Sequence, residues 1–296
     1  IIKNNHLDKI GLKTNVKHRL NDWIEIGANN NITYSENNRI PGAGLGTSTI
    51  GRTITQRPYD RPYKPNGEYY VGGTDDLIYH NMIQVLNEEE TYVNNLRYLG
   101  SLFSTINFMK NLSLKTSFST DIAYTDDNIL YNENHPYGAS IGVIKEGSRI
   151  YKSYLIENFA NYHAKTKNNF AYDLMIGHSF QKTDYKRTGV EAQGYPSPSF
   201  DVTGVAAEIV SAGSSVTAYA MDSYFGRANL SYDDRYILNL TFRADGSSKF
   251  SRANRYGYFP SASLGWNVSN EDFWINDKTD LKLRGSYGKT GNQEGI

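Results

Sequence analysis

Alternation between apolar and polar residues is the strongest pattern in this chain, and it is clearest near the C-terminal end. Between positions 236 and 243 one set of alternate residues is Tyr236, Leu238, Leu240 and Phe242, and the other is Ile237, Asn239, Thr241 and Arg243. A period of two places successive side chains on opposite faces of a strand. The segment therefore predicts a β-strand with one apolar and one polar face.

The same alternation recurs along the chain and predicts about ten strands, arranged as successive hairpins. Their ranges are 10–20, 23–34, 96–109, 112–124, 150–165, 170–185, 218–232, 236–245, 256–269 and 281–289. Short turns containing Asn or Asp join most of the pairs, as at Asn21-Asp22, Lys110-Asn111 and Asp233-Asp234. Such turns between alternating runs indicate hairpins.

Much longer connections separate the hairpins, over 35–95, 125–149 and 186–217, with a shorter one at 246–255. Connections of this length are uncommon in a compact soluble domain. Outer-membrane barrels, in contrast, combine short periplasmic turns with long extracellular loops. The predicted strands of roughly 10–16 residues are also long enough to cross a membrane. The predicted fold class is therefore all-β, an antiparallel transmembrane β-barrel segment.

Composition agrees with a barrel and excludes several other classes. Among 296 residues, 31 Lys plus Arg balance 31 Asp plus Glu, so no net charge favours nucleic acid. The mean hydropathy is −0.58, and no apolar run approaches the roughly 20 residues of a transmembrane helix. A barrel needs only every second residue to be apolar. Cysteine is absent, which excludes disulfides and thiolate chemistry.

Candidate catalytic and metal-binding residues are scattered. The histidines show neither HxH nor HExxH spacing; they are His6, His18, His80, His135, His163 and His178. The glycine-rich stretch 41–48 lacks the Lys of a phosphate-binding loop. The acidic pairs Asp75-Asp76, Asp126-Asp127 and Asp233-Asp234 do not follow the spacing of a calcium loop. We therefore predict no enzyme activity and no catalytic, cofactor or metal site.

Aromatic residues fall into two groups. Trp23, Trp274, Tyr232 and Tyr236 lie at or beside short turns, where they would form either an interfacial girdle or ordinary sheet packing. A second set lies in the long connections: Tyr59, Tyr63, Tyr69, Tyr70, Tyr79 and Tyr137. These side chains could contact sugars or peptides, or pack on one another. The first group clusters at one predicted depth, which favours the girdle; for the second set the sequence leaves the choice open.

The last quarter of the chain resembles the SusC/RagA family of TonB-dependent outer-membrane transporters of Bacteroidetes-type bacteria. The residues that carry the resemblance are 227–232 (RANLSY), 236–241 (YILNLT), 243–250 (RADGSSKF), 258–261 (YFPS), Gly265-Trp266, 271–273 (EDF), 281–288 (LKLRGSYG) and 291–293 (GNQ). The earlier part is similar in style, including the stretch 23–34 (WIEIGANNNITY).

The resemblance implies a barrel of about 22 strands around a plug domain, with a TonB box at the N-terminus. It also implies a surface lipoprotein of the SusD type as partner, the TonB complex as energy source, and oligosaccharides or peptides as cargo. The chain opens at IIKNNHLDKI without an initiator Met or a signal segment. We therefore expect residues 1–296 to be part of the barrel wall only, without the plug and the TonB box.

In such a wall the apolar face would meet outer-membrane lipid and the polar face would line the lumen. The polar set is Lys13, Lys17, Arg19, Lys115, Asp121, Arg227, Asn229 and Arg243. The resemblance also marks Arg243, Asp245, Gly246, Ser247 and Ser248 as an architectural motif, in which Gly246 eases a turn and the acid and base pair. No substrate-binding residue is assigned.

Two other readings stay open from the residues alone. One is a passive outer-membrane pore or adhesin built on a similar barrel, which would need no TonB complex. The other is a soluble β-rich carbohydrate-binding module, whose apolar faces would close into a core.

Overall fold

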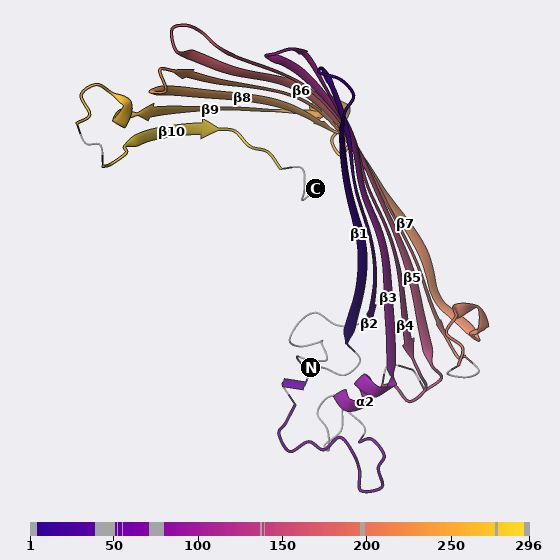
Figure 1. Ribbon diagram of the computed structural model, residues 1–296. Helices are drawn as coiled ribbons and strands as arrows, with labels where there is room; N and C mark the ends of the chain where they lie inside the picture. Colours follow the sequence, from indigo (N-terminus) through magenta and orange to yellow (C-terminus); the bar gives the residue numbers. More distant parts are fainter. Residues whose placement is uncertain are drawn as a thin grey trace.

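Ten β-strands form one antiparallel sheet in which the strands follow one another in chain order. The computed structural model describes residues 5–38, 51, 53–54, 56–70, 80–136, 138, 140–195, 199–275 and 278–292. Figure 1 shows the sheet as a single curved wall. The predicted all-β fold of about ten strands is confirmed.

The strands observed correspond one to one with the predicted strands, and their bounds agree closely at the short turns. The strands are β1 (His6–Arg19), β2 (Ile24–Asn38), β3 (Glu89–Met109), β4 (Leu112–Tyr131), β5 (Val143–Lys165), β6 (Phe170–Gln193), β7 (Glu208–Tyr232), β8 (Tyr236–Ser247), β9 (Tyr256–Asn267) and β10 (Lys282–Gly288). Short helical elements are α2 (Met82–Glu88), η1 (Thr203–Val205), η2 (Arg252–Asn254) and η3 (Val268–Asn270). In the described ranges, no helix has the length and apolar character needed to cross a bilayer.

The register between strands carries the alternation across the whole sheet. Leu238 of β8 lies directly opposite Leu230 of β7 and Leu264 of β9. One position along, Asn239 lies opposite Asn229. Residues that are directly opposite in a ladder share a face. The sheet consequently has one mainly apolar face and one mainly polar face, named below the apolar face and the polar face.

Turn chemistry fixes this register at the short connections. Asp233 and Asp234 have φ values of 53° and 54°, and Asn169 has φ of 58°. Asn and Asp tolerate this left-handed region better than other residues with a Cβ. At the first turn, the side-chain oxygen of Asn21 accepts hydrogen bonds from the backbone N–H groups of Trp23 and Ile24. The predicted Asn/Asp hairpin turns are confirmed.

The strands are longer than predicted at the end that carries the long connections. β6 continues to Gln193 and β7 begins at Glu208, whereas the sequence predicts a connection over 186–217. This part of the ladder is rich in Ser, Thr and Gly and has no apolar alternation, so its strand character rests on backbone pairing. Side-chain bonds add to it, as between the hydroxyls of Ser148 and Thr188 at 2.6 Å.

A small buried cluster lies at this same end of the sheet. Leu130, Ile144 and Tyr195 pack together, and Ile144 is fully buried. The Tyr195 hydroxyl donates to the carbonyl of Tyr131 at 2.8 Å. Burial, together with the negative charge of Glu133, raises the pKa of Tyr195 to about 12.

The helix α2 lies next to the ends of β3 and β4 in Figure 1. Asn81 caps it by accepting hydrogen bonds from the N–H groups of Ile83 and Gln84, which satisfies two of the free donors of a helix start. The Gln84 amide donates to the carbonyl of Asn134 at 2.5 Å, and the Asn132 amide donates to Glu88 at 2.6 Å. These bonds hold α2 to the β4–β5 connection.

Candidate functional site

The polar face gathers the charged residues that the sequence singles out. The register places on this one face Lys13, Lys17, Arg19, Lys115, Asp121, Arg227, Asn229 and Arg243. The predicted polar set therefore forms one surface, spread over β1, β4, β7 and β8. It is a lining rather than a compact site.

Ion pairs between neighbouring strands orient many of these charges. The Arg97 guanidinium donates to both carboxylate oxygens of Asp121, at 2.9 and 2.7 Å. Lys17 pairs with Glu25 at 2.9 Å. Pairs that are this exposed stabilise a fold by only about 0–1 kcal/mol each. Their main effect is to fix the direction of the charged groups across the face.

Aromatic rings lie among these charges, which the alternation does not predict. The Lys115 ammonium lies 5.2 Å from the ring centre of Phe103 and 5.8 Å from that of Phe159. The Arg243 guanidinium lies 5.3 Å from the ring centre of Phe225. These distances allow cation–π attraction. The polar face therefore alternates cations with aromatic surface.

Glycines on the adjacent strands make room for two of the rings. A Cβ atom at Gly27 would lie 2.2 Å from the ring of Phe103, and one at Gly177 would lie 2.4 Å from the ring of Phe225. Each ring thus covers a glycine across the ladder. Glycine inside a strand is a sequence signal for close approach of another group, but the ring that approaches is known only once the register is known.

A hollow of about 490 Å³ opens on this face between β1 and β6. The side chains that line it include Lys13, Asn29, Asp121, Ser153 and Gln181. The Gln181 amide donates to the Ser153 hydroxyl at 3.2 Å. Such a lining offers hydrogen-bond donors and acceptors to water or to a polar solute. Among the described residues, no group of three or more side chains is placed to hold a metal ion.

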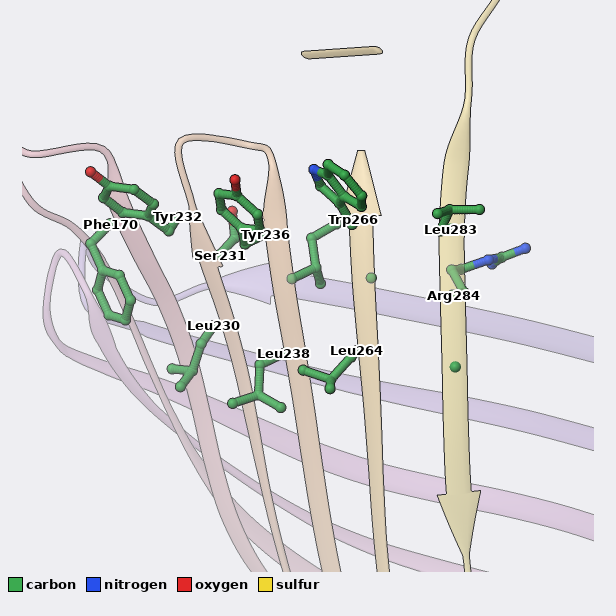
Figure 2. A pocket seen from close by; sticks show the side chains of 13 residues that line it. Phe170, Leu230, Ser231, Tyr232, Tyr236, Leu238, Leu264, Trp266, Leu283 and Arg284 are labelled. Atoms are coloured by element: carbon green, nitrogen blue, oxygen red, sulfur yellow. The ribbon is translucent and has the colours of Figure 1, made fainter. Parts of the chain in front are cut away.

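The apolar face carries a row of aromatic rings at the end with the short turns. Figure 2 shows Tyr232, Tyr236 and Trp266 side by side on β7, β8 and β9, next to leucines such as Leu238. Tyr236 lies directly opposite both Tyr232 and Trp266. The sequence predicts the place of the two tyrosines, but it misses Trp266 in this row.

The two other predicted girdle residues lie in the connections. Trp23 is half exposed in the β1–β2 turn. Trp274 lies between β9 and β10, where its indole N–H donates to the carbonyl of Thr279 at 3.1 Å. These two residues are therefore not part of the row that Tyr232 and Tyr236 form.

A hydrogen-bonded cluster around Glu271, named here the Glu271 cluster, lies just beyond this row. Glu271 accepts hydrogen bonds from the Tyr236 hydroxyl at 2.6 Å, from the Trp266 indole at 2.8 Å and from Arg235 at 3.1 Å. Arg235 also pairs with Asp272 at 2.8 Å. The bonds from Tyr236 and Trp266, with the charge of Arg235, hold the pKa of Glu271 below its ordinary value of 4.5. Turn residues and strand ends are thus bonded as one unit.

The motif 243–248 behaves only partly as predicted. Arg243 and Asp245 pair at 2.6 Å, as predicted. Gly246 does not ease a turn, because it lies inside β8 and outside the left-handed region. Its missing Cβ instead leaves room for the ring of Tyr256, which would be 2.7 Å from such an atom. The prediction for Gly246 is therefore wrong.

Two tyrosines of the first long connection pack on each other. The rings of Tyr63 and Tyr69 stack at 5.3 Å, and Tyr69 accepts a hydrogen bond from the Asn87 amide at 2.8 Å. Loop packing is therefore at least part of their role. The glycine-rich stretch 41–48 lies outside the described residues, as do Asp75, Asp76, Tyr79 and Tyr137.

Comparison with known proteins identifies relatives of this sheet. The family model "TonB dependent receptor-like, beta-barrel" matches residues 20–293. A TonB-dependent receptor of Formosa agariphila is 30% identical over 315 residues, which cover 99% of this chain and 30% of that protein. The TonB-dependent receptor SusC of Bacteroides thetaiotaomicron is 37% identical over 145 residues, or 48% of this chain.

Among solved structures, a chain of the RagAB peptide transporter superposes with a TM-score of 0.83 over 98% of this chain, at 23% identity. This likeness concerns the fold. The match covers 33% of that chain, and the sequence spans a similar share of the F. agariphila receptor. The ten strands thus correspond to about a third of such proteins.

Proposed function

This chain belongs to the TonB-dependent receptor-like β-barrel family of Gram-negative outer-membrane proteins, and from that premise we propose that it forms part of the wall of an active importer. The importer would lie in the outer membrane of a Bacteroidetes-type bacterium. Its apolar face would meet lipid and its polar face would line the lumen. The two-faced sheet is the observation that carries this proposal.

The apolar face exposes large apolar side chains, and such exposure to water is energetically unfavourable. Ile10 is 72% exposed, Ile176 is 71% exposed and Leu264 is 66% exposed. Each such side chain gains about 1.5–3 kcal/mol when it leaves water completely. Lipid supplies that environment along the lipid-facing band of a barrel wall.

The edges of the sheet support a wall that continues into further strands. β1 and β10 are the outermost strands of the described sheet. Backbone N–H and C=O groups at an open edge would lack partners in the bilayer. Strands from the rest of the protein would pair with these edges and close the barrel. We place the plug domain and the TonB box in that remaining part, with residues 1–296 in the barrel domain.

Import through such a barrel requires partners outside this chain. We propose the TonB complex as energy source and a surface lipoprotein of the SusD type as the cap. The cargo would be an oligosaccharide or a peptide. The polar face would contact the plug and the passing cargo, and it would carry out no chemical reaction.

Deletion of the gene in its own bacterium tests the proposal. Growth should fail on one oligosaccharide or peptide source and persist on monosaccharides or amino acids. Deleting tonB should cause the same defect, because import depends on energy coupling. Growth that survives loss of TonB but not loss of the gene would instead identify a passive pore. A protein found outside the membrane fraction would favour a soluble β-rich module.

A further inference from the structure

Three lysines interrupt the apolar face on β5 and β6. Lys152, Lys182 and Lys186 all belong to this face, because the register places them on the same side as Ile156 and Phe180. Lys182 lies opposite Tyr154, and Lys186 lies opposite Ile150. All three lysines are exposed. They form one group on neighbouring strands, named here the outer lysine cluster.

The height of the cluster coincides with the edge of the apolar band. About 12 residues separate Phe170 from Lys182 along β6, which is about 30 Å along the membrane normal for a strand tilted by about 40°. The lipid-facing band of an outer-membrane barrel is only about 25 Å tall. The lysines therefore lie just beyond the band, on the side of the long connections.

Over β4, β5 and β6, the row next to the cluster on its short-turn side is apolar and open. Phe118, Ile156 and Phe180 form one row across β4, β5 and β6, and they are 42%, 42% and 40% exposed. Acyl chains would cover such a row, and the headgroup of the same lipid would then lie at the level of the lysines. Apolar and cationic surfaces are therefore arranged in the order of a lipid molecule.

The charge of the cluster is only partly compensated. Asp184 is the acidic residue within it; it lies opposite Lys152 and 3.7 Å from the ammonium of Lys182. Asp222 on β7 lies opposite Phe180 and is bonded to His178 at 2.6 Å and to the Tyr256 hydroxyl at 2.9 Å. Among the described residues of this face, the three cations lie near Asp184, which already contacts Lys182, and Asp222, which already pairs with His178. The excess positive charge matches an anionic group.

We propose that the outer lysine cluster binds the phosphate of an outer-leaflet lipid A molecule, with the acyl chains on the Phe118–Ile156–Phe180 row. The proposal rests on the proposed outer-membrane function, since it requires this face to meet the outer leaflet. Lysine ammonium groups bind phosphate as point charges, and each contributes attraction at a membrane surface. The chain would thereby fix its height and rotation in the leaflet.

Binding to the complete purified transporter tests this directly. Native mass spectrometry in detergent would measure affinity for phosphorylated lipid A and for the same lipid after enzymatic removal of its phosphates. We expect the wild type to prefer the phosphorylated form. The variant Lys152→Gln/Lys182→Gln/Lys186→Gln should bind it about tenfold more weakly or worse, and should bind the dephosphorylated form like the wild type.

A matched variant changes three lysines of the polar face, Lys13→Gln/Lys17→Gln/Lys115→Gln, and should keep wild-type lipid affinity. Heat-modifiable migration on gels would show that both variants fold. Equal binding of the two lipids by the wild type would overturn the proposal. So would unchanged affinity in the cluster variant, or an equal loss in the matched variant. Because binding is measured without uptake, a protein that binds the lipid but imports nothing would contradict only the proposed function.

Discussion

The indole N–H of Trp266 donates to the Glu271 carboxylate over 2.8 Å, which ties the end of β9 to the connection that follows it. The Tyr236 hydroxyl bonds to the same carboxylate oxygen from β8. Phe273 packs edge-on against the Trp266 ring at 6.5 Å. The Glu271 cluster at the short-turn end of the wall therefore joins three parts of the family resemblance: Tyr236, Gly265-Trp266 and the EDF stretch.

Replacing Glu271 with Gln should weaken the hydrogen bonds of the Glu271 cluster. The amide offers one oxygen and one NH₂ group in place of two acceptor oxygens, so a donor would face the donors of Tyr236, Trp266 or Arg235. We expect the unfolding temperature of the complete barrel to fall by about 2–4 °C. Thermal unfolding followed by gel mobility measures this change.

Asp272→Asn is the matched control for that experiment. The Asp272 side chain is 90% exposed and reaches only Arg235 among the partners that the structure describes for it. Its replacement should leave the unfolding temperature unchanged within error. An equal effect of the two substitutions would contradict a specific role for Glu271.

The contribution of Glu271 should also depend on pH in a defined direction. Because its pKa in the folded protein is lowered below 4.5, folding favours the ionised carboxylate. The stabilisation is therefore present above pH 4.5 and is lost as the pH falls through the lower folded pKa. The stability difference between wild type and Glu271→Gln should be constant from pH 8 to about 5.5 and shrink in more acidic solution. A difference that instead shrinks as the pH rises would contradict this assignment.

The strands of the wall could be predicted on the side of the short turns, because contact with lipid imposes a period of two on their sequence. For example, the predicted strand 236–245 agrees well with the observed strand Tyr236–Ser247. Beyond the apolar band polar residues become frequent on both faces, and the alternation weakens. The first residues of β7, from Glu208 onward, are paired in the structure although the sequence predicts a connection there. Their strand character comes from the neighbouring strand rather than from their own pattern.

The polar face could be predicted as a set of residues but not as an arrangement. Alternation within each strand is enough to assign Lys115 and Arg243 to one side. It does not show that Phe159 lies next to Lys115, or that Asp121 pairs with Arg97, because these contacts depend on register between strands. The pairing of Arg243 with Asp245 agrees with what the family resemblance implies, and it needs no register because both residues belong to one strand.

Substituting Gly177 with Ala should destabilise the wall, because the new Cβ would meet the Phe225 ring at 2.4 Å. Overpacking of this kind costs about 1–3 kcal/mol. Gly213→Ala is the control, since no atom lies within 4 Å of a Cβ there; it should be neutral or stabilising by up to about 1 kcal/mol. Denaturant midpoints of the refolded barrel measure both effects.

A second substitution identifies the ring as the cause. In the double variant Gly177→Ala/Phe225→Ala, the added methyl group no longer meets an aromatic ring. The two substitutions should therefore be less destabilising together than the sum of their separate effects. Strict additivity would show that Gly177 is needed for its backbone rather than for the space it leaves to Phe225.

The two faces of the wall should differ in their accessibility to water, and the absence of cysteine from this chain makes the test simple. Leu240 belongs to the apolar face and Thr241 to the polar face of the same strand. In intact outer membranes, a charged thiol reagent should modify the Thr241→Cys variant at least about tenfold faster than the Leu240→Cys variant, because only the lumen admits water at this depth. The neighbours Ser117 and Phe118 of β4 provide an independent pair with the same expected order. Equal rates within both pairs, or the reverse order, would contradict the assignment of the polar face to the lumen. When the reagent is added after detergent extraction, the two rates should become similar, because lipid is what protects the apolar face.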